Sequence, residues 1–423
     1  ERHTKMPSTR VDTLIAGAGI PGLAFANARS KDESWLVLER DAAPGGYCRT
    51  IHQDGFVWDY SGHFFHFRHP EIEAFLRARM PGQEIITVTK SAGILFGGVR
   101  VDFPFQKNIH QLPMPDFLDC LHDLHFREAR PEHTFEDMLY ARFGRGIAER
   151  FLIPYNEKLY ACRMDALDPE AMGRFFPHAD EDAIIRNFKF PDPGSYNATF
   201  TYPRGGAVEY VNALLADLPP ERLALSESLV SLDLDAHEAT TTARTIRYDR
   251  LVSSLPFPTL ARAAALPFNS SDFNWNKVLV FNLGFDSKGQ ERDHWIYIPD
   301  RSISFYRVGY YDNIFGTANM SLYVEIGLTA TAEVGSLSDW LERVLIDLRK
   351  LGLIDGQRLV SWHSVVLDPA YVHVTERGKR AFERLKTELA AKDVHTAGRY
   401  GGWTYCSIED NIVEARALSE RLA

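Results

Sequence analysis

Thr13-Leu-Ile-Ala-Gly17-Ala-Gly19-Ile-Pro-Gly22-Leu-Ala-Phe-Ala-Asn27 is the stretch that decides the fold of this chain. An apolar run precedes its glycines, an alanine-rich helical pattern follows them, and a second apolar run, Trp35-Leu-Val-Leu38, ends at Glu39. This order predicts a strand, a tight turn, a helix and a second strand, the unit that binds a dinucleotide in Rossmann-like folds.

The three glycines and the acid each have a physical role in such a unit. Gly17 permits the tight turn, Gly19 lets backbone N–H groups approach a pyrophosphate, and Gly22 lets the helix pack close to the sheet. The anion lies at the positive end of the helix. Glu39, twenty residues after Gly19, is placed to accept hydrogen bonds from an unphosphorylated ribose. The alternative is a chance glycine-rich turn.

A second glycine turn favours a flavin over a nicotinamide cofactor. Gly45-Gly46-Tyr-Cys-Arg49 follows Glu39 closely and would let the backbone run along an extended cofactor, with Arg49 near its phosphates or the flavin edge. Nicotinamide dehydrogenases do not usually need this second turn, so we predict FAD. An ordinary surface loop is the alternative.

Composition limits the remaining classes. A chain of 423 residues with 45% apolar residues can bury a large core, and its net charge of −10 and pI of about 5.9 argue against a nucleic-acid surface. No run of eighteen apolar residues and no signal-peptide pattern is present, so we expect neither a membrane span nor export. Four scattered cysteines predict no metal site and no disulfide framework, which suits the cytoplasm.

The patterns along the chain predict an α/β protein in three parts. A discontinuous Rossmann-like FAD-binding domain takes residues 1–100, 200–262 and 375–423. A mainly helical substrate-binding insertion takes 101–199, because apolar residues recur there at helical spacing. An antiparallel β-sheet lobe takes 263–374, where β-rich runs alternate with turns, among them Lys277–Leu283, Trp295–Ile298, Ile303–Tyr306 and Ser321–Ile326.

Four segments, in order along the chain, resemble the UDP-galactopyranose mutase family, especially its eukaryotic-type members. They are Asp59-Tyr-Ser61-Gly62-His63; Val101-Asp-Phe103-Pro-Phe-Gln106; Pro154-Tyr-Asn156-Glu-Lys-Leu-Tyr160 with Asn197 through Gly206; and Trp295-Ile-Tyr297, Phe305-Tyr-Arg307 and Gly398-Arg399 through Tyr405. The resemblance implies a flavoenzyme without net redox change. In this family reduced FAD acts as a nucleophile at the anomeric carbon of a nucleotide-sugar, converting pyranose to furanose, and NADH or NADPH is a candidate external reductant.

The residues that match these motifs form the predicted site. Arg174 and Arg307 could close on one diphosphate from opposite sides, because guanidinium groups pair bidentately with phosphate. The resemblance places His63 beside the flavin, and the catalytic set is His63, Arg174 and Arg307. The other predicted cofactor contacts are Gly17, Gly19, Gly22, Glu39, Gly45, Gly46, Arg49, Gly62, Val230, Arg399 and Ile408, at the start of a closing helix. The substrate contacts are Phe103, Gln106, Asn156, Tyr160, Asn197, Tyr297, Tyr371 and Tyr405 together with both arginines.

Departures from the family pattern leave the base and the sugar open. Tyr160 stands where the family usually has a base-stacking tryptophan, Phe103 replaces a tyrosine and Ser61 replaces a glycine. Each tyrosine could also serve only in packing, and each arginine only as a solvated charge. Two other classes compete: a flavin amine oxidase or protoporphyrinogen-oxidase-like enzyme, and a non-catalytic flavin-fold protein. We expect a nucleotide-sugar partner, no nucleic acid and no membrane, with a homo-oligomer as a candidate assembly.

Overall fold

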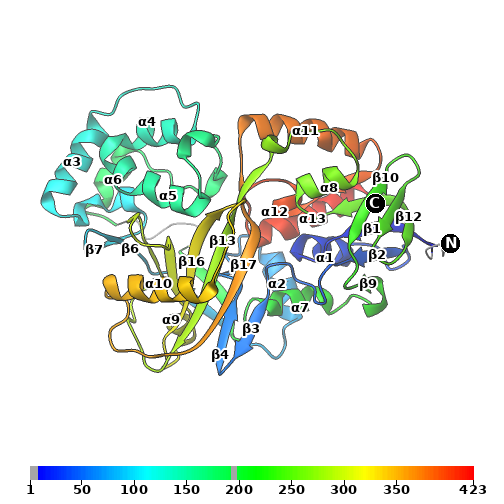
Figure 1. Cartoon of the computed structure of the whole chain (residues 1–423), viewed down its shortest axis with the longest axis horizontal. Coiled ribbons are helices and arrows are strands. Elements are labelled where there is room, and N and C mark those ends of the chain that lie inside the picture. The colour runs from blue at the N-terminus through cyan, green and yellow to red at the C-terminus, as the bar shows by residue number, and fades with distance from the viewer. Residues whose placement is uncertain (1–7, 192–197) are drawn as a thin grey trace.

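The computed structural model describes residues 8–191 and 198–423 (Figure 1). It is an α/β structure whose strands form two seven-stranded sheets and two small two-stranded sheets. One large sheet lies in the nucleotide-binding part at the right of Figure 1, and a helical lobe lies at the upper left, with strands β13, β16 and β17 between them. Strand β1, the first element that the structure describes, and the C-terminus are both on this part.

The first large sheet is the predicted Rossmann-like sheet. Its path runs β10-β11-β12-β1-β2-β9, and β18 also pairs with β12. Strand β1 (Ser8–Ala16) pairs in parallel with β2 (Trp35–Leu38) and with β12 (Thr245–Ser253), which lies more than 200 residues away in sequence. The remaining strands are β9 (Leu223–Ala224), β10 (Leu229–Asp233), β11 (Glu238–Thr241) and β18 (Val394–Thr396). The domain is therefore discontinuous, as the sequence predicts.

Helices from both ends of the chain cover this sheet. Helix α1 (Ile20–Asn27) begins in the first glycine turn with Pro21 in its first turn, where proline costs no hydrogen bond. Helix α13 (Ile408–Arg421) packs beside it, and Arg29 donates to the Ser419 carbonyl at 3.0 Å. The other helices of this part are α2 (Pro70–Ala78), α7 (Val208–Leu215), α8 (Phe257–Ala263), α11 (Glu376–Ala390) and α12 (Gly398–Gly401).

The second large sheet has the order β17-β13-β16-β15-β14-β6-β7. Its strands are β6 (Ala92–Phe96), β7 (Val99–Asp102), β13 (Asn274–Phe285), β14 (Trp295–Tyr297), β15 (Arg307–Tyr310), β16 (Ser321–Thr329) and β17 (Leu359–His373), with α9 (Tyr311–Phe315) and α10 (Leu337–Lys350) beside them. All neighbours are antiparallel except β14 and β6. The boundary predicted at residue 100 is thus corrected, because β6 and β7 hydrogen-bond to the sheet lobe.

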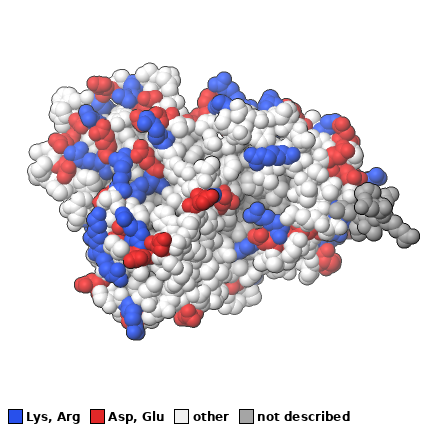
Figure 2. Space-filling model, in the orientation of Figure 1, with Lys and Arg blue, Asp and Glu red and all other residues white. Residues whose placement is uncertain are grey.

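The helical lobe consists of α3 (Met114–His125), α4 (Phe135–Ile147), α5 (Ile153–Tyr160) and α6 (Glu181–Asn187). Its charges are intermixed on the face shown in Figure 2, and many are locally paired; Arg150, for example, contacts both Asp116 and Asp119. An aromatic core that includes Phe105, Phe151 and Tyr306 joins this lobe to the second sheet. The lobe therefore forms one wall over the sheet rather than a separate unit.

Two small sheets and several short turns complete the chain. The small sheets pair β3 (Thr50–Gln53) with β4 (Phe56–Asp59) and β5 (Ile85–Thr89) with β8 (Thr199–Pro203). Among the short turns, Gly173–Phe175 carries Arg174. No helix in residues 8–191 or 198–423 combines the length and apolar character that a membrane span needs.

Candidate active site

The first glycine turn lies at the carboxyl end of β1. Gly17 has φ of +104°, a conformation that favours glycine, and its N–H donates to the Leu38 carbonyl at 2.9 Å. A Cβ on Gly22 would lie 1.9 Å from the Gly17 carbonyl oxygen. Gly19 differs, because its φ is −75° and the nearest atom to an added Cβ is 3.7 Å away. The protein itself leaves room at Gly19, as a closely approaching ligand requires.

The second glycine turn is fastened to the first. The Gly45 N–H donates to the Ala18 carbonyl at 2.8 Å, and a Cβ on Gly46 would meet the Gly19 Cα at 3.4 Å. Glu39 is buried and accepts hydrogen bonds from the Ala18 N–H at 3.0 Å and the Asp41 N–H at 2.9 Å. The two turns and the acid therefore form one continuous cradle.

Two further predicted cofactor residues lie on segments that contact this cradle. Arg49 donates from Nη2 to Asp41 at 2.9 Å, whereas its buried Nε has no hydrogen-bond partner among the described residues. Val230 lies on β10 and is 54% exposed. The segment before it reaches the cradle, since the Glu227 N–H donates to the Glu39 carbonyl at 2.8 Å.

The closing turn of the chain packs against the start of α1. Gly398 has φ of +84°, and a Cβ there would lie 2.5 Å from Pro21 Cγ. Ile408 is the first residue of α13, whose N-cap Ser407 forms a capping box with Asp410. Glu409 is buried and accepts from the Arg68 and His69 N–H groups, so the acids of this first turn are used by the protein.

His63 lies in the loop between β4 and α2, which the sequence predicts to be beside the flavin. Its Nδ1 is 3.0 Å from the Ser61 carbonyl oxygen. A carbonyl only accepts, so Nδ1 carries the proton and Nε2 is an acceptor in the neutral ring. Burial lowers the pKa of His63 to about 4, with Arg399 and Arg307 acting in the same direction. The ring is therefore neutral at physiological pH.

Arg307 extends from β15 toward its cross-strand neighbour Glu325 on β16. Nη2 donates to Glu325 Oε1 at 2.8 Å, and Nε donates to Oε2. Burial opposes the charge of Arg307, but Glu325 more than offsets this effect, so the pKa of Arg307 is raised above its ordinary value. The arginine is held in position by a carboxylate and is not a solvated charge.

Arg399 lies against two of the predicted tyrosines. Its guanidinium carbon is 5.0 Å from the Tyr371 ring centroid and 4.6 Å from that of Tyr405, and the two rings stack at 5.9 Å. The buried Nε of Arg399 has no hydrogen-bond partner in the part of the chain that the structure describes. Cation–π contacts thus hold its charge while one donor stays available.

A residue predicted to face the flavin, His63, and one predicted to face the substrate, Tyr371, share the same charged neighbours. Arg307, Glu325 and Arg399 act electrostatically on His63, and the same three groups act on Tyr371, whose pKa is raised chiefly by burial and also by Tyr405. Tyr297 is tied to the set through Arg307 and Tyr405. The fold therefore brings His63, Arg307 and Arg399 into one site with three predicted tyrosines, Tyr297, Tyr371 and Tyr405.

Arg174 reaches the same region from the helical lobe. Its Nη2 lies 2.6 Å from both carboxylate oxygens of Asp410, and the ring of the adjacent Phe175 is 4.9 Å from that of Tyr405. The side chain is about one-third exposed. In this state Arg174 pairs with a carboxylate of the α13 first turn, and an anionic ligand would compete with that carboxylate for it.

Buried polar atoms mark the predicted base end of the site. Asn156 donates to the Leu152 carbonyl at 2.7 Å and Gln106 to the Pro177 carbonyl at 2.5 Å. Within the described ranges, Asn156 Oδ1, Gln106 Oε1 and the hydroxyl of Tyr160 have no hydrogen-bond partner. Tyr160 is fully buried, 5.6 Å from the Tyr371 ring. Unpaired buried polar groups are costly, which is consistent with a ligand that pairs them.

Two predicted substrate residues remain to be placed. Phe103 packs on Tyr297 with ring centroids 4.7 Å apart, and the Tyr297 hydroxyl accepts from Trp295 at 2.9 Å. Asn197 lies outside the described residues.

Sequence reasoning missed Glu325, the partner of Arg307. The signal was present, because Glu325 is the lone charge in the apolar run Ser321-Leu-Tyr-Val-Glu-Ile and is 1% exposed. A charge at a buried strand position is rarely left unpaired. Over residues 8–191 and 198–423, no group of three or more His, Cys, Asp or Glu side chains could hold a metal ion.

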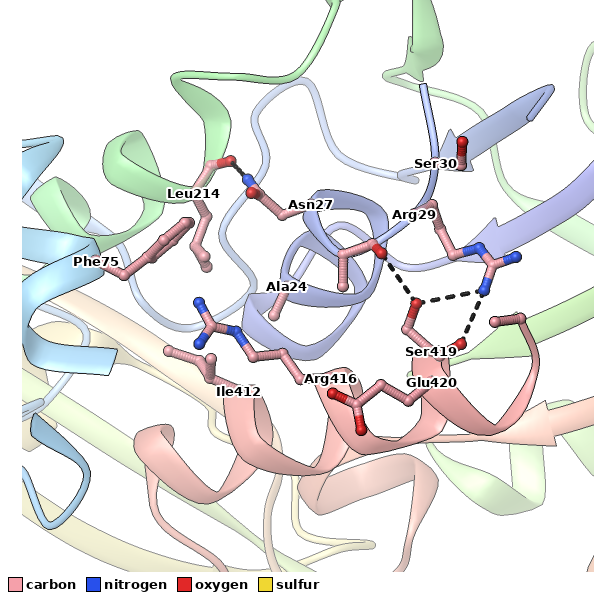
Figure 3. A pocket seen from close by; sticks show the side chains of 12 residues that line it. Ala24, Asn27, Arg29, Ser30, Phe75, Leu214, Ile412, Arg416, Ser419 and Glu420 are labelled. Atoms are coloured by element: carbon pink, nitrogen blue, oxygen red, sulfur yellow. Dashed lines mark hydrogen bonds between the residues drawn. The ribbon is translucent and has the colours of Figure 1, made fainter. Parts of the chain in front are cut away.

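A cavity of about 650 Å³ lies away from this site (Figure 3). It is bounded by the C-terminal half of α1 and by α13, with Phe75 and Leu214 opposite, and Arg416 stacks 4.7 Å from the Phe75 ring. None of the predicted site residues that the structure describes lines it. Because the glycine turn is at the other end of α1, this cavity is distinct from the cofactor cradle.

Comparison with known proteins decides the family. The sequence pattern of flavin containing amine oxidoreductase matches residues 30–423. The chain belongs to the flavin-containing amine oxidoreductase family. The family match and the similarity to a solved flavoenzyme structure support a Rossmann-type FAD-binding fold, which the two glycine turns also indicate.

Solved structures refine the comparison. A reduced UDP-galactopyranose mutase is similar over 97% of this chain and 95% of its own, with 25% identity and a TM-score of 0.90. A putative protoporphyrinogen oxidase from Exiguobacterium sp. 255-15 covers 99% of both chains at 17% identity and a TM-score of 0.77. Putrescine oxidase bound to putrescine covers 98% and 99% at 13% identity and 0.68. These last two show a shared fold.

The residues of this flavin-containing amine oxidoreductase family member fit FAD. The open position at Gly19 suits a pyrophosphate, Glu39 suits a ribose, and the unused Nε donors of Arg49 and Arg399 suit anionic or carbonyl acceptors.

Proposed function

We propose that the protein is an FAD-dependent nucleotide-sugar mutase, interconverting the pyranose and furanose forms of a UDP-sugar of the UDP-galactose type. The observation that carries the proposal is that Arg307, Glu325 and Arg399 act on both His63 and Tyr371. A reaction between a cofactor ring and a sugar diphosphate needs both in one buried place. The TM-score of 0.90 to a reduced UDP-galactopyranose mutase supports it.

The side chains of the site can separate a sugar from its diphosphate. When bound, reduced FAD would supply the nucleophile for the anomeric carbon, and NADH or NADPH would supply its electrons. Arg307 is preorganised by Glu325 to receive the negative charge of the leaving diphosphate, and Arg174 adds a second guanidinium after it exchanges Asp410 for phosphate. The hydroxyls of Tyr297, Tyr371 and Tyr405 are further donors for the same oxygens.

The flavin-side loop supplies a neutral, oriented imidazole. His63 donates from Nδ1 to the Ser61 carbonyl, so its Nε2 faces outward from that bond as an acceptor. The pKa of about 4 keeps it uncharged between two arginines. The buried tyrosines Tyr155, Tyr306 and Tyr323 lie near enough to Arg307 to interact with it electrostatically, and they would limit access of water to the reacting carbon.

An amine oxidase is the second candidate, because the family match itself names that chemistry. The charges of the site oppose it. An amine substrate arrives as a cation, whereas Arg307, Arg399 and the single carboxylate of Glu325 leave a net positive charge beside His63. Like charges in a buried site disfavour such a ligand. A nucleotide diphosphate is the ligand whose charge these residues complement.

The two functions are separated by the fate of oxygen and electrons. The FAD-loaded protein is reduced anaerobically with dithionite and given UDP-galactopyranose or its furanose isomer. The mutase proposal expects many turnovers from one reduction, inactivity of the oxidised protein and no oxygen consumption. Absence of isomerisation, with stoichiometric hydrogen peroxide formed from an amine such as putrescine, would instead establish the oxidase. Arg307→Ala should abolish isomerisation while leaving the FAD spectrum in place.

A further inference from the structure

Ser61 has an unusual backbone for its residue type. Its φ is +73°, in the left-handed region that glycine occupies without strain and other residues occupy rarely. The next residue, Gly62, has no room for a side chain, since a Cβ there would lie 2.9 Å from the Tyr323 hydroxyl and 2.8 Å from Phe64. The loop is thus pressed against β16 while carrying a serine where a glycine would be unstrained.

The Ser61 hydroxyl has a specific and buried partner. It donates to Glu325 Oε1, the same oxygen that accepts Arg307 Nη2 at 2.8 Å. Ser61 is 6% exposed and Glu325 is 1% exposed. Tyr323 and Glu325 are two residues apart on β16 and therefore lie on the same face of the strand. The face that packs on Gly62 also holds Ser61 and Arg307.

The backbone of the same serine holds the histidine. The Ser61 carbonyl accepts from His63 Nδ1 at 3.0 Å, so one residue is bonded on one side to the imidazole and on the other to the partner of the diphosphate arginine. We propose that Ser61 is a positioning residue that couples the flavin-side loop to Arg307 through Glu325. The inference rests on the proposed function, which assigns Arg307 to a diphosphate.

This arrangement has a thermodynamic consequence. An anion that draws Arg307 away from Glu325 would remove one hydrogen bond from Glu325 Oε1. The Ser61 hydroxyl would then be the remaining side-chain donor bonded to this oxygen within the described residues. The loop that carries His63 then responds to the anion, and the anion responds to the flavin by the same factor, because coupling between two sites is reciprocal. Diphosphate affinity should therefore differ between oxidised and reduced protein, and Ser61 should transmit the difference.

The test compares two substitutions that differ in backbone strain. Ser61→Ala removes the hydroxyl and keeps a side chain at positive φ, whereas Ser61→Gly removes the hydroxyl and the strain. The control is Ser321→Ala on β16, the strand that carries Glu325. The Ser321 hydroxyl accepts from Trp58 Nε1 at 2.9 Å and forms no hydrogen bond with Glu325 or Arg307 in the described structure. Dissociation constants of UDP and of inorganic pyrophosphate are measured for each FAD-loaded variant, oxidised and reduced, with the flavin midpoint potential with and without UDP.

We expect UDP and pyrophosphate to bind roughly fivefold or more weakly in both Ser61 variants, and the potential shift caused by UDP to shrink equally in both. Ser61→Gly should unfold at a higher temperature than Ser61→Ala, and Ser321→Ala should keep wild-type binding. A purely structural serine would change the unfolding temperature and leave the ligand constants and the potential shift unaltered, which overturns the inference. If wild type binds neither UDP nor pyrophosphate, the proposed function fails first and the coupling fails with it; if wild type binds but does not isomerise, only the proposed function fails.

Discussion

Gly19 and Gly22 belong to one motif, but the structure assigns them different reasons for being glycine. A Cβ at position 22 would lie 1.9 Å from the Gly17 carbonyl oxygen, and ordinary contact begins at 3.4 Å, so Gly22→Ala must separate α1 from β1 by about 1.5 Å. Overpacking of this kind costs about 1–3 kcal/mol, and a backbone clash puts this substitution at the upper end. The ligand-free protein itself should lose that stability.

Gly19→Ala should behave in the opposite way. The backbone at position 19 has φ of −75°, and the added Cβ meets only Pro21 Cδ at 3.7 Å, so the ligand-free fold accepts alanine. An N-cap alanine costs about 1 kcal/mol or less relative to glycine. The methyl group would occupy the space through which a pyrophosphate reaches the helix N-terminus. FAD affinity should therefore fall at least tenfold, or about 1.4 kcal/mol.

Urea unfolding of the ligand-free proteins and titration of each with FAD by flavin fluorescence separate the two effects. Glu39→Gln adds a third case, with ribose contacts weakened and both glycine turns intact. Wild-type FAD affinity in Gly19→Ala would refute the pyrophosphate assignment. An unfolding curve for Gly22→Ala that matches wild type would refute the packing argument, because α1 would then have moved without cost.

Three other predictions concern the proposed substrate contacts and His63. Arg307→Lys and Arg174→Lys should each reduce the preference for binding UDP over UMP, measured by calorimetry. Arg307→Lys should also lower kcat/KM for the UDP-sugar by several kcal/mol of transition-state stabilisation, because a buried bidentate contact is lost. An equal binding preference in wild type and variants would contradict the clamp. Tyr160→Phe removes a hydroxyl that has no partner among the described residues, so the ligand-free protein should be as stable as wild type or more so while UDP binds more weakly; tighter or unchanged UDP binding would show that this hydroxyl does not face the nucleotide. Burial lowers the pKa of His63 from 6.5 to about 4, so the contribution of this residue to stability is present above pH 6.5 and is lost, by roughly 3 kcal/mol, as the pH falls through 4. His63→Gln should make the unfolding free energy of the ligand-free protein less dependent on pH between those limits. An NMR titration that places the pKa of His63 near 6.5 would contradict the buried neutral ring.

Local patterns predicted the nucleotide-binding part well because its signals are short-range. The turn Gly17-Ala-Gly19, the helix after it and the strand before Glu39 are contiguous in sequence, and the structure has β1, α1 and β2 in that order. The closing helix likewise begins at the predicted Ile408, where Ser407 and Asp410 form a capping box. Each of these elements carries its own start or stop residue.

Pairing between strands that are distant in sequence was harder to predict from the sequence. The sequence predicts a strand at 303–306, but β15 begins at Arg307, because the cross-strand bond with Glu325 fixes the register and the preceding residues form a turn. Strands β6 and β7 join the sheet lobe for a related reason: β6 pairs with β14, which lies about 200 residues further along the chain, and β7 pairs with β6. Short apolar strands carry no mark of which sheet they join.

For the candidate site, the sequence indicated the charges that we propose to face the ligand but not the groups that orient them. Arg174, Arg307 and Arg399 follow motifs, whereas Glu325 and Asp410 become visible as their partners only when the segments come together. The structure also shows that both acids of the α13 first turn are occupied, one by backbone N–H groups and one by the cap and Arg174. Such pairings depend on side-chain direction, which spacing along the chain does not encode.

The pairing of β1 with β12, and of β12 with β18, also governs when during synthesis the cofactor can be acquired. A ribosome that has released the whole glycine turn and the second strand still has more than 200 residues to add before β12 flanks β1, and about 140 more before β18 is available. Long-range closure of this kind is slow and leaves strand edges exposed. Pulse-labelled chains stalled before residue 394 should therefore lack stable flavin, and flavin uptake would report completion of the chain rather than formation of its first motif.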